Sequence, residues 1–90
     1  MREDYDFEWD DAKDASNSKK HGVTFADATQ IWNDPMFLEV LLTSEPEERR
    51  AVIGKVGKND YLTAIVTYRG DVIRIISARK STKKEVDAYA

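Results

Sequence analysis

The feature that most constrains this fold is a change in the spacing of apolar residues at Met36. Beyond this point apolar residues come in short runs rich in valine, isoleucine, leucine and aromatics, which is typical of β-strands. Hairpin-length loops separate the last three runs, so these strands should pair antiparallel. We therefore predict a four-stranded antiparallel sheet from MFLEVLL (36–42), RRAVIGKV (49–56), YLTAIVTY (61–68) and VIRIISA (72–78).

Ahead of Met36 the sequence predicts two helices. Asp10 is a suitable N-cap for a helix from about residue 11 to residue 20, and Gly22 is suited to end it. Thr24 and Asp27 have the spacing of a capping box that opens a second helix. The apolar stripe of this second helix should face the core, and it consists of Phe25, Ala28, Ile31 and Trp32.

A third helix is predicted at the C-terminal end, where Thr82 and Glu85 again have the spacing of a capping box. Ninety residues are enough for one domain and too few for two. We therefore predict a single domain over residues 1–90. Its fold class is α+β, with two N-terminal helices, a four-stranded antiparallel sheet and a short C-terminal helix.

The register of the hairpins predicts which side chains share a face of the sheet. If Lys58-Asn59 and Arg69-Gly70 are two-residue turns, Val52 lies opposite Ile65 and Thr67 lies opposite Val72. One face then carries Arg50, Thr63, Thr67 and Arg74. The other face, which the helices should cover, then carries Ala51, Ile53, Leu62, Ala64, Val66, Ile73 and Ile75.

The composition excludes several classes of protein. The chain has no cysteine, so it has no disulfide, no thiolate metal site and no catalytic thiol. It has no aspartate-rich metal motif, and we predict neither a metal nor another cofactor. Its apolar runs are too short to span a membrane, and its acidic start differs from a signal peptide. We therefore expect a cytoplasmic protein without a membrane partner.

The charges are unevenly distributed although the net charge is only -3. Acidic residues dominate the first 14 residues, and basic residues dominate positions 69 to 90. The two ends could neutralise each other within the fold. Alternatively, the basic end faces an anion or an acidic partner.

Four segments carry a family signature: FEWD (7–10), KKHGVTF (19–25), the arginine pair 49–50, and IRIISARKSTKKE (73–85). Together, and in this order, they resemble the BrnT toxin family of bacterial type II toxin-antitoxin systems. The resemblance implies a RelE-like fold and a ribonuclease activity that halts translation, so that RNA is the substrate. It also implies a BrnA-type antitoxin that masks the toxin and through which the toxin meets DNA only indirectly.

Several side chains suit metal-independent cleavage of RNA, which needs cations on the phosphate and a group that transfers protons. Arginine binds phosphate through two parallel hydrogen bonds and stays charged. The predicted catalytic arginines are Arg50, Arg74 and Arg79, and the predicted RNA-binding lysines are Lys19, Lys20, Lys80, Lys83 and Lys84. We expect the antitoxin to cover this basic side of the sheet.

His21, the single histidine, has two interpretations. It could bond the last carbonyls of the first helix before Gly22, or it could donate a proton or bind a phosphate beside Lys19 and Lys20. We include it among the predicted catalytic residues, and it should then lie near the face of Arg50 and Arg74.

Two other functions are compatible with the same sequence. A nucleic-acid-binding module without catalysis would share the basic face and would need no group that transfers protons. A protein-docking module would use the apolar strand MFLEVLL or the basic face to bind a partner.

Overall fold

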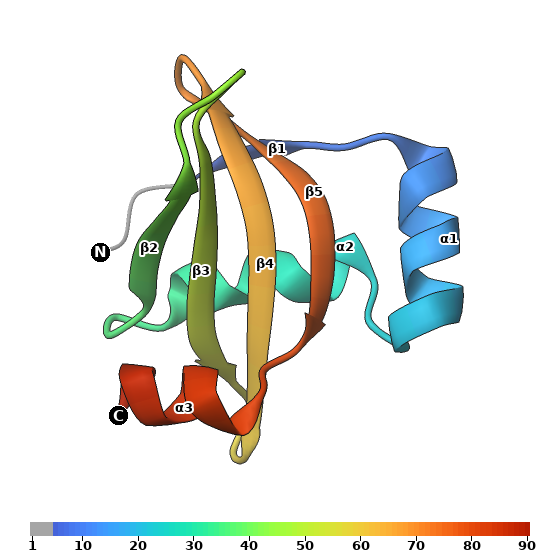
Figure 1. Cartoon of the computed structure of the whole chain (residues 1–90). Helices are drawn as coiled ribbons and strands as arrows, with labels where there is room; N and C mark the ends of the chain where they lie inside the picture. The colour runs from blue at the N-terminus through green and yellow to red at the C-terminus, as the bar shows by residue number, and fades with distance from the viewer. Residues whose placement is uncertain (1–4) are drawn as a thin grey trace.

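The structure, a computed structural model, describes residues 5–90 and has an α+β fold in which helices pack on both faces of one sheet (Figure 1). Short connections join the elements, which follow one another in the order predicted after Met36. In chain order they are β1 (Asp6–Glu8), α1 (Asp11–His21), α2 (Phe25–Ala28), the 3-10 helix η1 (Thr29–Asn33), β2 (Leu38–Thr43), β3 (Arg49–Val56), β4 (Asp60–Arg69), β5 (Val72–Lys80) and α3 (Lys83–Tyr89).

The helix ends confirm the signals in the sequence. The Asp10 side chain accepts hydrogen bonds from the first amides of α1, and Gly22 ends that helix with a φ of 72°. Both capping boxes form, Thr24 with Asp27 and Thr82 with Glu85. The second predicted helix is present, but after Ala28 it continues as the tighter η1.

The sheet has five strands in the order β1-β5-β4-β3-β2 within the described residues. The four strands β2 to β5 form the predicted antiparallel meander. The expectation of a four-stranded, wholly antiparallel sheet is wrong, because β1 pairs parallel with β5 and makes the sheet mixed. This three-residue strand is held by Phe7, whose ring packs edge-on against Trp32 with centroids 5.1 Å apart.

One turn overturns the predicted face of Arg50. The β3–β4 loop has three residues, since Val56 pairs with Asp60, and Ala51 rather than Val52 lies opposite Ile65. A slip of one residue turns every side chain of a strand to the opposite face. Arg50 therefore shares a face with Val66, while Ala51 and Ile53 share the other face with Ile65 and Thr63.

The β4–β5 hairpin also differs from the predicted register, yet its faces are correct. Its turn residues are Gly70 and Asp71, with Gly70 at a φ of 61°, and Arg69 pairs with Val72. This slip is two residues, which preserves the face of each side chain. Thr63, Thr67 and Arg74 therefore share a face as predicted, with Thr67 directly opposite Arg74.

The core lies between α2, η1 and one face of the sheet, which we call the helix-covered face. Phe25, Ala28, Ile31 and Trp32 are buried there as the stripe predicted. The residues of the sheet that meet them are Val52, Leu62, Ala64, Val66, Ile73, Ile75 and Ala78. Gly54 permits the close approach of η1, because a Cβ at this position would stand 2.7 Å from Ile31 Cγ2.

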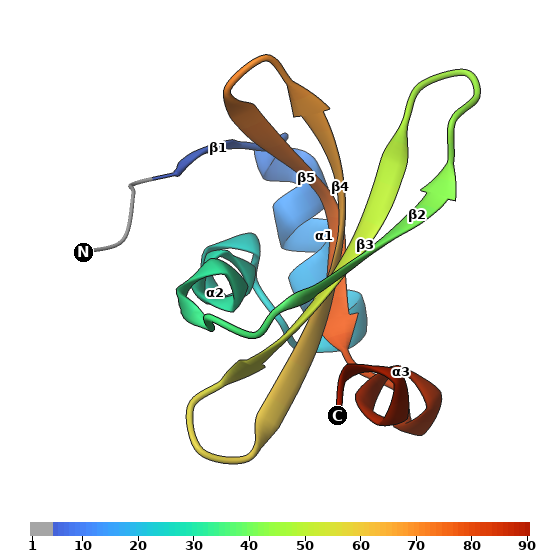
Figure 2. The same ribbon diagram turned by 90° about the vertical axis from the view of Figure 1, so that its left-hand side faces the viewer.

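We call the other side of the sheet the arginine face, defined by Arg49, Thr67, Arg69, Arg74 and Arg79. Figure 2 shows α2 and α3 on opposite sides of the sheet, so α3 lies on the arginine face. It lies at the end where β3 finishes and β4 begins, and it leaves the beginning of β3 and β5 uncovered (Figure 1). Between residues 5 and 90, no helix has the length and apolar character needed to cross a membrane.

Candidate functional site

The uncovered part of the arginine face carries a row of alternating charges. Arg74 Nη1 lies 3.2 Å from Glu8 Oε2, and Arg69 Nη1 lies 3.9 Å from the same oxygen. Glu47 then links Arg69, at 3.9 Å, to Arg49, at 3.4 Å. We call these five residues the arginine row. It holds three positive and two negative charges and draws them from β1, β3, β4, β5 and the loop before β3.

The arginine row is open to a ligand. The side chains of Arg49 and Arg69 are 43% and 55% exposed. Exposed ion pairs of this kind contribute only about 0 to 1 kcal/mol, because water screens them. A phosphate, which guanidinium binds through two parallel hydrogen bonds, can therefore replace the carboxylates at small cost. The arginine row can therefore bind a phosphodiester, with the carboxylates of Glu8 and Glu47 next to it.

Thr67 holds β4 and the start of β3, which both contribute to the arginine row, in a fixed relative position. The residue is 4% exposed, and its hydroxyl donates a hydrogen bond of 2.8 Å to the carbonyl oxygen of Glu48. This bond ties β4 to the residue that precedes β3, and so it sets where Arg49 begins its strand. The threonine that the register placed beside Arg74 is thus a positioning residue.

Arg79 lies on the same face but is engaged by α3. Its two terminal nitrogens donate to the two carboxylate oxygens of Glu85, at 2.6 and 2.7 Å. This bond raises the pKa of Arg79, and the bond from Arg79 lowers the pKa of Glu85 to about 2. Thr63 donates a further hydrogen bond to Glu85. In this state Arg79 anchors α3 to the sheet.

Arg50 is separated from the other predicted arginines. It lies on the helix-covered face, where Nε is 3.4 Å from Glu39 and Nη2 is 3.1 Å from Glu48. Tyr68 is on the same face, and its burial together with the nearby Glu39 raises its pKa to about 12. The prediction that Arg50 and Arg74 clamp one phosphate from a common face is therefore wrong.

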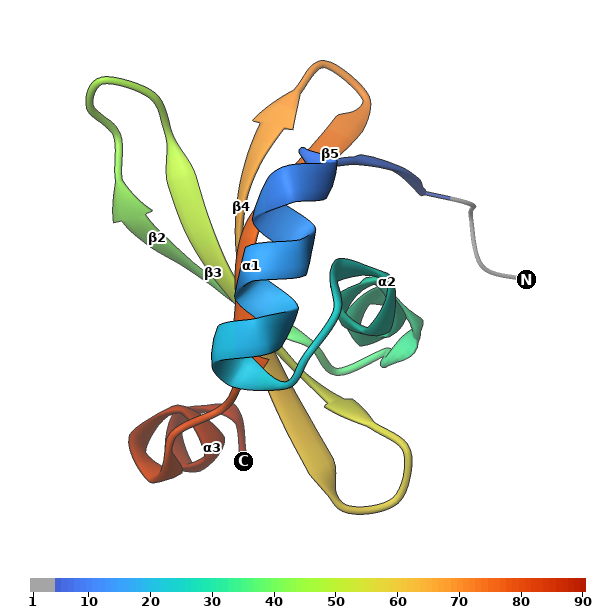
Figure 3. The same cartoon turned by 90° about the vertical axis from the view of Figure 1, so that its right-hand side faces the viewer.

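His21 lies apart from the arginine row. It is half-buried in the last turn of α1, with Lys19 and Lys20 exposed beside it. Asn17 anchors α1 to the backbone of Ala78, so the helix lies beside β5 (Figure 3). Its C-terminal end lies beside the end of β5 that carries Arg79 and Lys80. Since a strand rises 3.3 Å per residue, Arg79 is about 16 Å from Arg74 along β5. His21, at the Arg79 end, is therefore distant from Arg74.

The predicted lysines gather where α1 and β5 end and α3 begins. Lys80 ends β5 and shares a shallow hollow with Gly22, while Lys83 and Lys84 lie in the first turn of α3. Lys83 pairs with Asp87 of the same helix, and its side chain is 89% exposed. Lys83 and Lys84 border the arginine face, whereas Lys80 pairs with Leu62 and lies on the helix-covered face. None of these lysines belongs to the arginine row.

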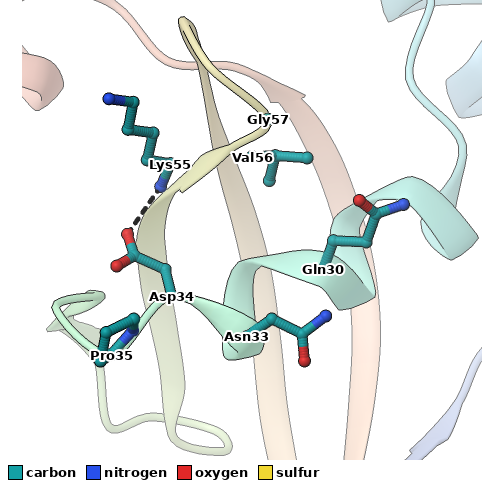
Figure 4. Close-up of a pocket in the computed structure, with 7 residues that line it drawn as sticks. All are labelled: Gln30, Asn33, Asp34, Pro35, Lys55, Val56 and Gly57. Carbon is teal, nitrogen blue, oxygen red and sulfur yellow. Dashed lines mark hydrogen bonds between the residues drawn. The ribbon is translucent and has the colours of Figure 1, made fainter.

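A hollow of about 310 Å³ lies beside Asp34, whose hydrogen bonds connect three elements of the fold (Figure 4). The Asp34 carboxylate accepts hydrogen bonds from the amides of Met36 and Lys55 and from the Tyr89 hydroxyl, at 2.9, 2.8 and 2.5 Å. Burial alone would raise its pKa, but these bonds outweigh burial and lower it. The bond to Asp34 raises the pKa of Tyr89 to about 12. Asp34 therefore joins η1, β3 and α3.

Sequence reasoning missed four members of the arginine row: Glu8, Glu47, Arg49 and Arg69. The arginine pair 49–50 belongs to the family signature, but the one-residue error in the predicted turn places Arg50 instead of Arg49 beside Arg74. A signal for β1, and with it Glu8, was present in the alternating aromatics Tyr5, Phe7 and Trp9, of which Phe7 and Trp9 pack on the core. Among residues 5–90 no group of three His, Cys, Asp or Glu side chains is arranged to hold a metal ion.

Comparisons with known proteins agree on one family. A family model described as "Ribonuclease toxin, BrnT, of type II toxin-antitoxin system" matches residues 9–85. The crystal structure of the Brucella abortus ribonuclease toxin BrnT is similar to this fold, with a TM-score of 0.68 and 22% sequence identity. The match covers 89% of this chain and 100% of that chain. Comparison with curated proteins gives no match.

Proposed function

This chain belongs to the BrnT family of ribonuclease toxins of type II toxin-antitoxin systems, and from that membership we propose that it cleaves RNA at the arginine row. The observation that carries the proposal is that Arg49, Arg69 and Arg74 gather on one uncovered face with carboxylates between them. We further propose that the fold is RelE-like and that cleavage halts translation.

The first role of the arginine row is to bind the scissile phosphate and stabilise the charge that develops on it. Guanidinium groups do this without a metal, because they stay charged and their planar nitrogens match two phosphate oxygens. Arg74 is the first candidate, since its side chain is 29% exposed and therefore held more firmly than Arg49 or Arg69. Cleavage through these residues would need no metal ion.

The second role is proton transfer. The 2'-hydroxyl loses its proton to a base as its oxygen bonds to phosphorus, and the 5'-oxygen takes up a proton from the acid so formed or from water as its bond to phosphorus breaks. Glu8 is the better placed base, because its carboxylate already lies 3.2 Å from Arg74. A phosphate bound by Arg74 would bring the attacking hydroxyl within reach of that carboxylate. His21 is the second candidate, and it would act with Arg79 and Lys80 at the other end of β5.

RNA is long enough to extend from the arginine row to the lysines around the C-terminal end of β5. Lys19, Lys20 and Lys80 lie near the C-terminal ends of α1 and β5, and Lys83 and Lys84 follow on α3. Lysines at this distance from the arginine row would contact the phosphates of flanking nucleotides, which strengthens binding without reading sequence.

A protein antitoxin follows from membership of a type II system. We propose that it is of the BrnA type and that it neutralises the toxin by covering Arg74, Arg79 and the lysines of residues 80–84. Acidic side chains of the antitoxin should meet these cations, since complementary charges speed association and fix the register.

The proposal is tested by incubating the purified chain with a labelled single-stranded RNA in EDTA and separating the products on a gel. The parent should cut the RNA, and Arg74→Ala should cut about 10² to 10³ times more slowly, the usual cost of one charge-stabilising group. Binding without cutting by the parent would favour the non-catalytic nucleic-acid-binding module. Cutting that EDTA abolishes would contradict metal-independent chemistry.

A further inference from the structure

Strand β2 borders an apolar groove on the arginine face. The groove has a volume of about 220 Å³ and lies between the edge of the sheet and α3. Val40 and Leu42 of β2 form one wall, Ala51 and Ile53 of β3 form the floor, and Lys84, Glu85 and Ala88 of α3 form the other wall. We call this site the β2 groove.

The edge of the sheet beside the groove is also open. Within the described residues β2 is the last strand of the sheet and pairs only with β3. Its side chains are unusually apolar for an edge, with Val40, Leu41 and Leu42 at 41%, 49% and 53% exposure. Glu39 is the one charged residue of the strand, and it lies on the helix-covered face. Edge strands that face water are usually protected by charges or proline.

We infer that an extended segment of the antitoxin docks here, adding a strand to β2 and inserting alternate apolar side chains into the β2 groove. The inference rests on the proposed function, because a type II toxin has a protein partner. A strand suits the site better than a helix does, since the backbone groups of β2 need pairing and the groove lies beside one face of that edge. Residues two apart in the added strand would point into the groove.

The charges around the groove describe this segment further. Lys84 lines it, and the exposed Lys83 lies next to Lys84 in the sequence of α3. The one acid that lines the groove, Glu85, is already paired with Arg79. The occupant should therefore carry an acidic residue where it passes α3. A second copy of this chain fits less well, because its β2 carries its single acid, Glu39, on the other face, away from Lys84. The β2 groove and the arginine row are both on the arginine face, so an antitoxin that adds a strand to β2 can continue across this face to the row.

The test measures how tightly the antitoxin encoded with this chain binds surface variants, by isothermal titration. Leu42→Lys places a charge in the groove and should weaken binding by about 10- to 100-fold, the value of one buried leucine side chain. Leu41→Lys is the matched control, because Leu41 pairs with Arg50, lies on the other face and is exposed to a similar extent. It should change the affinity less than threefold.

The same variants are assayed for RNA cleavage without antitoxin, where both should match the parent. A parent that binds antitoxin but does not cut RNA would contradict the proposed function and leave the groove result valid. Unchanged binding by Leu42→Lys would overturn the inference, and so would equal losses for Leu41→Lys. A parent dimer that Leu42→Lys converts to a monomer, with antitoxin binding intact, would assign the surface to a second copy and also overturn it.

Discussion

The ion pair between Arg79 and Glu85 gives the sharpest quantitative prediction, because it anchors α3 on the arginine face. The pKa of Glu85 is lowered from 4.5 to about 2, first by the hydrogen bond from Arg79. One pKa unit is worth about 1.4 kcal/mol, so a shift of this size corresponds to about 3 kcal/mol of folding free energy. The Glu85 side chain is 21% exposed, so solvent screening reduces this value only in part.

The sign of the pH dependence follows from the direction of the shift. A carboxyl whose pKa is lower in the folded state stabilises the fold fully above its unfolded pKa, near 4.5, and loses this contribution as pH falls toward about 2. Glu85→Gln should therefore lower the free energy of unfolding by about 2 to 3 kcal/mol at pH 7. The difference between parent and variant should shrink as pH falls from 5 to 2.

Urea unfolding of both proteins at pH 7, 4 and 2.5 measures this difference. The titration of the other carboxylates affects parent and variant alike and therefore cancels. Asp87→Asn is the matched control, because its pair with Lys83 lies on the same helix with side chains 64% and 89% exposed. The control should change stability by less than about 0.5 kcal/mol. A constant difference at all three pH values would refute the reasoning.

The same variant reports on the role of Arg79 in RNA binding. Glu85→Gln frees a guanidinium on the arginine face, so RNA affinity should rise, and the dependence of log K on log salt should steepen by about one contact. An unchanged affinity and salt dependence in the folded variant would assign Arg79 to anchoring α3 alone.

The remaining predictions concern the face of β3, the proton-transfer group and the core. Arg49→Ala should slow RNA cleavage at least about tenfold and Arg50→Ala less than threefold, since the two arginines lie on opposite faces; equal losses in the gel assay would contradict this. Glu8→Gln should slow cleavage by about 10² to 10⁴ and His21→Ala less than threefold. The opposite result would identify His21, at the Arg79 end of β5, as the group that transfers the proton. Gly54→Ala should lower the free energy of unfolding by about 1 to 3 kcal/mol, because its Cβ would meet Ile31; a melting temperature equal to that of the parent would exclude this clash.

Short-range patterns in the sequence predicted most of the elements. Asp10, Thr24 and Thr82 cap helices through bonds to amides two or three residues away, so the residues involved lie together in the printed sequence. The apolar stripe of Phe25, Ala28, Ile31 and Trp32 is likewise local, and all four side chains are buried. The family signature identified the BrnT family for the same reason, since its segments are contiguous.

The tertiary structure alone decided which charges meet. One residue more in the turn after Val56 exchanged Arg50 for Arg49 on the arginine face, because side chains in a strand alternate with a period of two. Glu8 joined Arg74 only through the parallel pairing of β1 with β5, a contact between residues 66 apart that no local pattern specifies. The sequence therefore determined the elements and the family, and the register and strand order determined the site.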